Sequence, residues 1–258
     1  MILERLKLLL KLSIVFLCLG SLAAIAGLLY IQKGLPKIES VEDYRPILAT
    51  KVYSDDGHLV ARVAKERRTL VPIEVVPEHV IHSFLAAEDR NFFSHEGLDY
   101  LGILRAALKN LRPGAHLQGA STITQQTVKT LILGPERSYS RKMKEAVLSR
   151  QIEQLLTKRE ILYLYLNQIY FGRGAWGIEE AAREYFGKSV RDLTLSEGAY
   201  LASTPKHPSR YNIRANPEAS KKRQHYVLEQ MLSAGWASEE EVRKINEEPA
   251  PRPAPRPT

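Results

Sequence analysis

Cysteine is almost absent from this chain, with Cys18 as the single one among 258 residues. One cysteine cannot form an intrachain disulfide framework, and it cannot build a cysteine-based zinc site. Packing must therefore hold the fold together. A chain of this length can bury one good core, and the sequence indicates one main domain of about 200 residues without a second complete one.

Acidic residues are also in deficit. The chain has 37 Lys+Arg against 29 Asp+Glu, which gives a net charge of +8. A basic protein favours anionic partners such as phosphates, anionic lipid headgroups or nucleic acid. Net charge does not choose among these three, so the choice depends on the motifs.

Charge is missing altogether from residues 12–31. A run of this length matches the hydrocarbon core of a bilayer, about 30 Å thick, and we expect a transmembrane helix here. Because Arg5, Lys7 and Lys11 precede it, the positive-inside tendency keeps the N-terminus in the cytoplasm. The rest of the chain would then lie outside the cytoplasm. A cleaved signal peptide is the alternative, since residues 24–26 (Ala-Ile-Ala) resemble a cleavage site, although the apolar run continues beyond them.

Composition divides the chain into four parts. They are a cytoplasmic N-terminus and membrane anchor (1–33), a polar connector with a β-hairpin (34–71), a helical domain (72–248) and a proline-rich tail or linker (249–258). The hairpin is expected because two β-prone runs, 47–54 and 58–64, flank the turn sequence Asp55-Asp56-Gly57.

Residues 72–248 show helical spacing and no further strand alternation, which predicts a mostly α domain. Four helix starts are marked by a capping box or an Asn-Pro pair, at Thr157, Thr194, Asn216 and Ser238. A helix over 98–111 would place four leucines on one face: Leu98, Leu101, Leu104 and Leu108. The bases on its other faces, Arg105 among them, are interpreted as a solvated surface.

The first stretch with chemical promise is 87–97, in which Glu88 and Asp89 follow an apolar helical run. A carboxylate at the edge of an apolar cluster loses hydration, so its pKa rises towards the range useful to a general base. Glu88 is the candidate. The alternative is that both acids are ordinary solvated helix residues, with Phe92 and Phe93 in the core.

The second stretch is 119–129, where small residues and hydroxyls lead into a predicted helix. The free N–H groups of this helix would form a cradle for phosphate oxygens, with Lys129 about two turns further on. Gln125 and Gln126 are costly to bury without hydrogen bonds, so we expect both to bind backbone or substrate. An ordinary N-cap followed by an amphipathic helix is the alternative.

The third stretch, 137–145, carries four bases and then an acid. In a helix that begins near Ser140, Arg141 and Glu145 share a face, with Lys142 beside them. These residues form either an exposed ion pair or a pyrophosphate clamp in which Glu145 could hold a divalent cation. Spacing alone does not decide between the two.

Two other features are set aside. The sequence Ser203-Thr204-Pro205-Lys206 matches a penicillin-reactive Ser-x-x-Lys, but neither Ser-Asp-Asn nor Lys-Thr-Gly follows, and the proline interrupts the helix that this motif needs. His95 and His207 lack partners at metal-ligand spacing, and we interpret both as structural.

Five motifs follow one another along the helical domain: Glu88-Asp89-x-x-Phe92-Phe93-x-His95-x-Gly97, Gly119-x-Ser121-Thr122-Ile123-Thr124-Gln125-Gln126, Arg141-Lys142-x-x-Glu145, Glu160-Ile161-Leu162-x-x-Tyr165-Leu166-Asn167-x-Ile169-Tyr170-Phe171-Gly172 and Leu193-Thr194-Leu195-x-Glu197. Together they resemble the peptidoglycan glycosyltransferase family, which comprises monofunctional transglycosylases and class A penicillin-binding proteins. The departures from the family pattern are mild, such as Ala120 where glycine is usual, and they remove no charge from the site.

The resemblance implies an α-helical, lysozyme-like fold with a membrane-embedded smaller lobe. It implies an enzyme of bacterial cell wall synthesis that polymerises lipid II into β-1,4-linked glycan strands. Glu88 would take the proton from the acceptor 4-hydroxyl, which attacks the donor anomeric carbon with inversion and releases undecaprenyl pyrophosphate. Glu145 would assist this leaving group or bind Mg²⁺.

The resemblance also assigns the substrate-binding residues. The bases that would neutralise the pyrophosphate are Lys129, Arg137, Arg141 and Lys142. The other residues expected to contact substrate are Asp89, Phe93, Ser121, Thr122, Gln125 and Gln126. The expected partners are lipid II, the growing glycan chain, the membrane and cell wall synthesis proteins. A divalent cation such as Mg²⁺ is the cofactor considered, and no organic cofactor is expected.

Three alternatives stay open at this point. A lysozyme-like enzyme that cleaves glycan would explain Glu88 but would leave the bases around Arg141 idle. A non-catalytic membrane-anchored scaffold is opposed by the presence of both Glu88 and Glu145. Nucleic-acid binding rests on charge alone and conflicts with the expected topology. The sequence also does not distinguish a monofunctional enzyme from the front module of a truncated bifunctional chain.

Overall fold

The computed structural model describes residues 5, 7, 10–22, 50–53, 55–56, 59–63, 67–111, 119–133 and 138–255. Residues 10–22 are helical. Within these ranges, no helix has both the length and the apolar character needed to cross a membrane. The span expected over 12–31 lies partly outside the described residues, so it stays a prediction.

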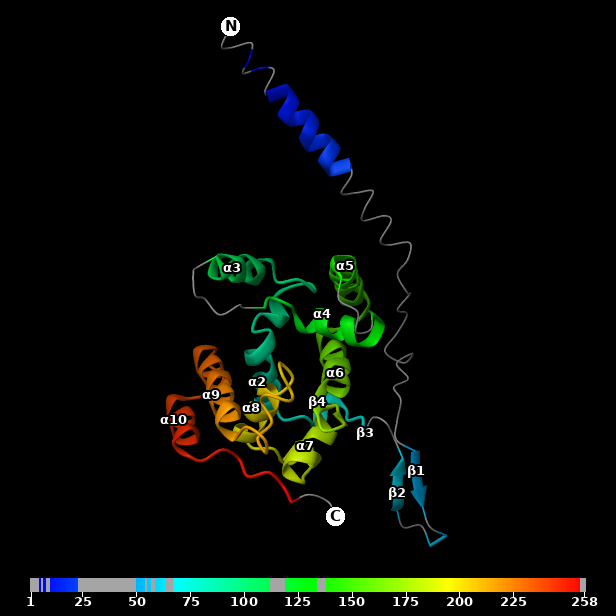
Figure 1. Ribbon diagram of the computed structural model, residues 1–258, viewed down its shortest axis with the longest axis vertical. Helices are drawn as coiled ribbons and strands as arrows, with labels where there is room; N and C mark the ends of the chain where they lie inside the picture. Colours follow the sequence, from blue (N-terminus) through cyan, green and yellow to red (C-terminus); the bar gives the residue numbers. More distant parts are fainter. Residues whose placement is uncertain are drawn as a thin grey trace.

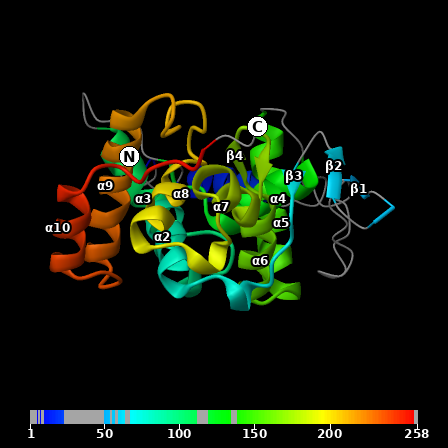
Figure 2. The ribbon, with the colours of Figure 1, turned by 90° about the horizontal axis from the view of Figure 1, so that it is seen from below.

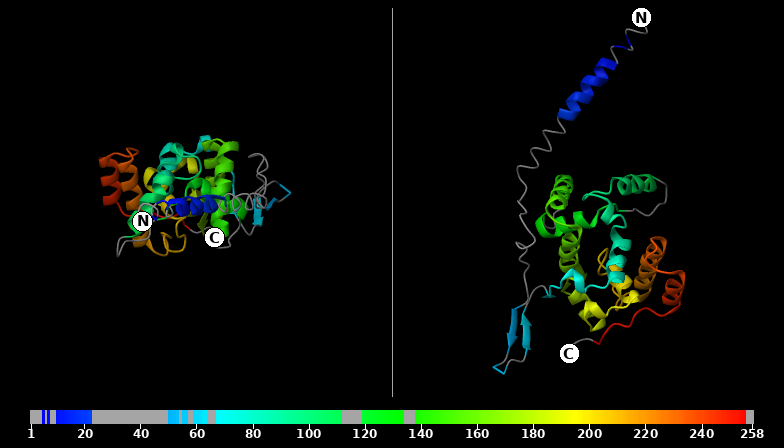
Figure 3. Two further views of the ribbon diagram at one scale, coloured as in Figure 1. Left: turned by 90° about the horizontal axis from the view of Figure 1, so that it is seen from above. Right: turned by 180° about the vertical axis from the view of Figure 1, so that it is seen from behind.

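The expected hairpin is present. Strand β1 (Thr50–Tyr53) pairs antiparallel with β2 (Leu59–Val63). The two strands project away from the helices, as Figures 1 and 3 show from opposite sides.

A second, smaller sheet corrects the expectation that no strand follows Pro72. Its strands are β3 (Arg67–Arg68), β4 (Tyr170–Gly172) and β5 (Ala175–Trp176), in the order β3-β5-β4. Strands of two or three residues are too short for an alternating pattern to show in the sequence. The sheet ends at Gly177, whose φ is +82° and where a Cβ would lie 2.8 Å from the Asn167 carbonyl oxygen. Only glycine fits this position.

Helices make up the rest of the domain, as predicted. They are α2 (Glu78–Glu88), α3 (Tyr100–Asn110), α4 (Ile123–Val128), α5 (Tyr139–Leu155), α6 (Lys158–Gln168), α7 (Ile178–Phe186), α8 (Leu195–Ser203), α9 (Pro217–Ser233) and α10 (Glu239–Glu247). Short 3-10 turns lie at Ile73–Val75, Phe92–Ser94 and Val190–Asp192, and a π-helical segment, η3 (Lys129–Leu133), extends α4.

The helix starts follow the local sequence. Complete capping boxes precede α6, α8 and α10, at Thr157, Thr194 and Ser238, and α9 begins at Pro217. In each box the hydroxyl and the Glu three residues later satisfy backbone donors at the helix start, which contributes about 1 kcal/mol. These four predictions are confirmed.

Helix α2 forms the centre of the core. It packs against α8 and α9, and Figure 2 shows it among them. The buried ring of Phe84 meets the edges of Tyr165 and Phe171, with centroids 6.2 and 5.9 Å away. Burial of such a side chain contributes about 1.5–3 kcal/mol. The end of α2, where Glu88 lies, therefore rests on a rigid base.

The leucine face of α3 does not enter this core. Leu101, Leu104 and Leu108 are exposed, and Ala106 is the buried residue of this helix. Helix α3 lies at one edge of the domain (Figure 1). An apolar face left open to this extent marks an interaction surface.

Candidate active site

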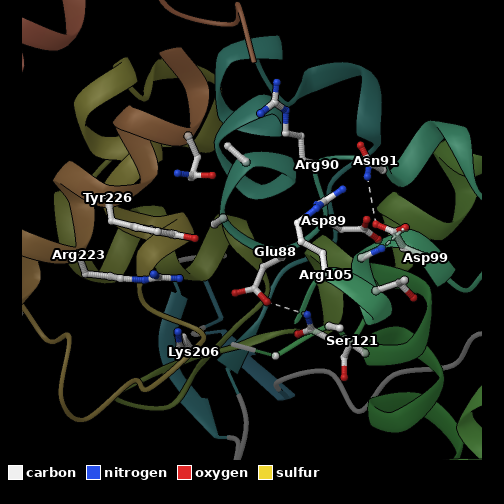
Figure 4. A pocket seen from close by; sticks show the side chains of 18 residues that line it. Glu88, Asp89, Arg90, Asn91, Asp99, Arg105, Ser121, Lys206, Arg223 and Tyr226 are labelled. Carbon is white, nitrogen blue, oxygen red and sulfur yellow. Dashed lines mark hydrogen bonds between the residues drawn. The ribbon is translucent and has the colours of Figure 1, made fainter. Parts of the chain in front are cut away.

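A cleft of about 370 Å³ opens at the C-terminal end of α2 (Figure 4). Its wall comes from the residues after α2, from α3, from the start of α4 and from α9. The lining residues are Ala86, Ala87, Glu88, Asp89, Arg90, Asn91, Asp99, Gly102, Arg105, Gly119, Ala120, Ser121, Thr122, Gln126, Lys206, Arg223, Tyr226 and Gln230.

Glu88 is the last residue of α2, and its carboxylate points into this cleft (Figure 4). It accepts a hydrogen bond of 2.7 Å from the side-chain amide of Gln126. Burial raises the pKa of Glu88 above its ordinary value, while the Gln126 hydrogen bond and the charges of Arg223 and Lys206 partly offset the rise. A carboxylate with a raised pKa is a stronger base than a solvated one, as general-base catalysis needs.

Asp89 is buried, and its carboxylate is turned into the protein. Its two oxygens lie 3.1 Å from His95 Nε2, and Oδ2 also accepts a 2.9 Å hydrogen bond from the Ile123 backbone N–H. Asp89 thereby fixes the start of α4, which carries Gln126 to Glu88. His95 has the structural role expected of it, and Asp89 acts in the described structure as a scaffold residue.

The start of α4 differs from the predicted phosphate cradle. The Ile123 N–H is taken by Asp89, and the Gln125 N–H is taken by the Thr122 hydroxyl, which itself donates to the Gly97 carbonyl. The Gln125 side chain accepts from the Thr122 N–H in a complete capping box. The expectation of free N–H groups is therefore wrong at these positions. The expectation that Gln125 bonds backbone is confirmed.

A second buried acid, Glu145, lies on α5 and is 2% exposed. Lys142 Nζ lies 2.8 Å from one of its oxygens, and Arg141 Nε lies 3.3 Å from the other. Lys142 Nζ also donates to the Ser121 hydroxyl at 2.9 Å. Ser121 lines the cleft, so it connects this group of charges to the site. The predicted ion pair is present, and its acid is buried rather than exposed.

Five of the described residues that were expected to bind substrate do not line the cleft: Phe93, Gln125, Lys129, Arg141 and Lys142. Lys129 is exposed on η3, and Phe93 is 59% exposed with its ring against the edge of Phe92. Arg137 lies outside the described residues.

Four cleft cations were missed by the sequence reasoning, which gave Arg90 no role and interpreted Arg105 as part of a solvated surface. Lys206 follows α8, and Arg223 lies on α9; Figure 4 shows both beside Glu88. Burial and the nearby charge of Arg223 lower the pKa of Lys206, and the Glu88 carboxylate partly offsets this. Lys206 belongs to the Ser-x-x-Lys sequence that was set aside. No local spacing links Lys206 and Arg223 to Glu88, because the packing of α8 and α9 against α2 brings them together.

Glu145 is the residue predicted to hold a divalent cation. Both carboxylate oxygens already face a positive side chain. Among the described residues, no group of three or more His, Cys, Asp or Glu side chains could hold a metal ion. Magnesium prefers several oxygen ligands. A cation at Glu145 would have to share the carboxylate with Lys142 and Arg141, and the bound Mg²⁺ stays a prediction.

The helical domain and its cleft, with a partly buried acid beside positively charged side chains, have the features of an enzyme active site. The family model described as "Transglycosylase" matches residues 56–232. The chain is 43% identical to penicillin-binding protein 1A of Rickettsia prowazekii over 93% of its own length, and 45% identical to that of Aquifex aeolicus over 86%. The chain belongs to the transglycosylase family.

The chain spans about a third of the length of these relatives, 31% in both cases. Penicillin-binding protein 1A of Pseudomonas aeruginosa is 43% identical over 91% of this chain and 29% of the relative. A crystal structure of penicillin-binding protein 1A from Haemophilus influenzae covers 80% of this chain and 21% of that one, with 27% identity. Its TM-score of 0.46 is too low to support an argument about the fold.

Proposed function

We propose that this chain is a peptidoglycan glycosyltransferase, which polymerises lipid II into glycan strands in bacterial cell wall synthesis. The observation that carries the proposal is the Glu88 carboxylate, partly buried in a cleft and bonded to an amide rather than paired with a base. Membership of the transglycosylase family supports the same reaction class.

Glu88 acts in this proposal as the general base. Its carboxylate takes the proton from the 4-hydroxyl of the acceptor sugar, and that oxygen attacks the anomeric carbon of the lipid-linked donor from the side opposite the leaving group. A β-1,4 bond forms as the bond from the anomeric carbon to the pyrophosphate breaks. A positioned base of this kind accelerates a reaction by about 10² to 10⁴-fold.

The leaving group, undecaprenyl pyrophosphate, carries away the electron pair and needs positive charge. Lys142 is suited to this role because Glu145 and Ser121 hold its ammonium group next to the cleft. Arg141 stands beside it on the same acid. Preorganised cations stabilise developing charge at little reorganisation cost. By the family resemblance, Lys129 and Arg137 would join them once the substrate is bound.

The membrane is the proposed location of the substrate and of the enzyme. Lipid II carries a long hydrocarbon tail, and the exposed leucines of α3 offer an apolar surface next to the cleft residue Arg105. We place α3 in the membrane-embedded lobe of a lysozyme-like fold. The catalytic domain would lie on the periplasmic side of the inner membrane, anchored by the segment 12–31.

The test is to incubate the detergent-solubilised chain with labelled lipid II and to resolve the products on a gel. A ladder of lengthening glycan strands is the expected result. Shortening of preformed glycan without a ladder would indicate a cleaving enzyme and overturn the proposal. Parallel reactions with Mg²⁺ and with EDTA test the cation; equal rates are expected, because Lys142 and Arg141 already occupy Glu145.

A further inference from the structure

Tyr165 is a buried tyrosine of α6 that the reaction described above does not use. It is 2% exposed, and its ring packs edge-on against Phe84, with centroids 6.2 Å apart and planes at 77°. Phe84 lies one turn before Glu88 on α2. The phenol is therefore held by aromatic packing next to the helix turn that leads to the proposed base.

The hydroxyl of Tyr165 has no hydrogen-bond partner among the residues that the structure describes. Native proteins rarely leave a buried hydroxyl in this state. The two other large buried tyrosines differ, because Tyr185 donates to the Phe171 carbonyl at 2.8 Å and Tyr200 donates to the Tyr211 carbonyl at 3.2 Å. The orphaned hydroxyl thus points to a partner that is met during function.

The groups around this hydroxyl identify the partner. Burial, with the charges of Glu88 and Asp89, raises the pKa of Tyr165 well above its ordinary value, so the phenol keeps its proton and can donate it. The Asp89 oxygens already form hydrogen bonds with the His95 ring and the Ile123 backbone N–H. Within the described part of the chain, Glu88 accepts a hydrogen bond only from the side-chain amide of Gln126. Glu88 is the acceptor with capacity left.

We propose that Tyr165 is a positioning residue for Glu88, whose ionised carboxylate accepts a hydrogen bond from the Tyr165 hydroxyl, directly or through one water. The inference rests on the proposed function. Burial disfavours the charge that a base must carry, and a second donor beside Gln126 keeps Glu88 ionised and aimed at the acceptor hydroxyl. Tyr165 retains its own proton throughout, and the proton that Glu88 takes comes from the acceptor sugar.

Other charged groups also act on Glu88. Arg223 and Lys206 face it from α9 and from the segment after α8 and favour its ionised form, whereas Asp89, its neighbour on α2, disfavours it. None of these is changed when the Tyr165 hydroxyl is removed. A Tyr165→Phe variant keeps the ring that packs against Phe84, so it isolates the hydrogen bond.

The experiment measures the pH–rate profile of lipid II polymerisation for the wild type, Tyr165→Phe and the control Tyr185→Phe. Because Glu88 works ionised, loss of a donor to its carboxylate moves the acid limb of kcat to higher pH. We expect kcat of Tyr165→Phe to fall about tenfold at the acidic end, with KM for lipid II unchanged. Tyr185→Phe removes a buried hydroxyl that donates elsewhere, and its profile should match the wild type.

A second measurement needs neither activity nor a substituted tyrosine. In protein labelled with ¹³C at the tyrosine ring carbon that bears the hydroxyl, the Tyr165 signal should shift as Glu88 titrates, and this shift should be absent in Glu88→Gln. An unchanged acid limb in Tyr165→Phe, or a Tyr165 signal that ignores Glu88, would overturn the inference. A wild type that makes no glycan while the NMR shift is present would instead refute the proposed function and leave the contact standing.

Discussion

The two glutamates of the site are held in opposite ways. Glu88 receives a neutral amide, Gln126, and burial raises its pKa. Glu145 is more deeply buried, yet Lys142 and Arg141 face its two oxygens. Glu88 therefore remains able to accept a proton, whereas the charge of Glu145 is neutralised by Lys142 and Arg141.

This difference separates two roles that the motifs alone do not distinguish. A carboxylate that meets an amide in a cleft can accept a proton at neutral pH. A carboxylate that meets two cations in a buried position is an anchor, since removal of either partner leaves an uncompensated charge. We propose from this contrast that Glu88 transfers the proton and that Glu145 positions Lys142 and Arg141.

The largest effect expected from the Glu145 region is that of Lys142→Met. The change removes the ammonium that bridges Glu145 and Ser121, so the pyrophosphate loses one preorganised cation. We expect kcat/KM for lipid II to fall about 100-fold. The control is Lys144→Met, which removes a neighbouring base of α5 and leaves the contacts of Lys142 with Glu145 and Ser121 in place. Equal losses in the two variants would show that general charge, rather than this contact, is responsible.

A smaller effect is expected from Lys206→Met on the Glu88 side. The Lys206 charge lowers the pKa of Glu88, so its removal raises that pKa and moves the acid limb of the rate to higher pH. The shift should shrink in high salt, because Lys206 is exposed. Lys244→Met on α10 removes the same charge away from the cleft and should leave the profile unchanged; a matching shift there would refute a local effect.

Stability gives a third comparison, since the folded protein raises the pKa of Glu88 above the ordinary value of 4.5. Below 4.5, the folded and unfolded chains both hold the proton and no penalty arises. As pH rises through the raised pKa, the unfolded chain ionises more readily and the folded state loses stability. Glu88→Gln should therefore unfold at a higher temperature than the wild type at pH 7.5, with the difference vanishing below 4.5. A lower Tm at pH 7.5 would contradict this.

The smallest effect on activity is expected from Thr194→Ala, which removes the capping box of α8 far from both acids. The loss of the cap should cost about 1 kcal/mol of unfolding free energy in a denaturant titration. The rate of polymerisation per folded molecule should not change. A large fall in this rate would mean that activity depends on the stability of the whole domain and not specifically on the contacts of Glu88 and Glu145.

Local signals in the sequence account for most of the fold and for both acids. Capping boxes at Thr157, Thr194 and Ser238 are satisfied within four residues, so the pattern itself contains the partners. Glu88 follows an apolar helical run, and Glu145 follows Arg141 at helical spacing. The same reasoning missed β3, β4 and β5, because each strand has only two or three residues and β3 pairs with β5 across more than 100 residues of sequence.

Site residues whose position depends on tertiary packing were harder to predict from the sequence. Lys206 and Arg223 reach Glu88 because α8 and α9 both pack on α2, and no spacing in the sequence shows this packing. Of the N–H groups expected to be free at the start of α4, that of Ile123 is satisfied by Asp89 from the first motif, and those of Thr122 and Gln125 are satisfied by the capping box. Phe93 lies in the same motif as Glu88, yet its ring faces solvent. Membership of a motif therefore does not determine whether a side chain points into the cleft.

The most direct test compares the rates of lipid II polymerisation by Glu88→Gln and Glu145→Gln. We predict that Glu88→Gln loses activity by about 10³-fold with its fold intact, because the amide keeps the shape of the side chain and removes the base. Glu145→Gln should retain more activity and lose stability, since Lys142 and Arg141 are left without a counter-charge. A Glu88→Gln variant with rates like the wild type, or a Glu145→Gln variant that is equally inactive and fully stable, would contradict the division of roles.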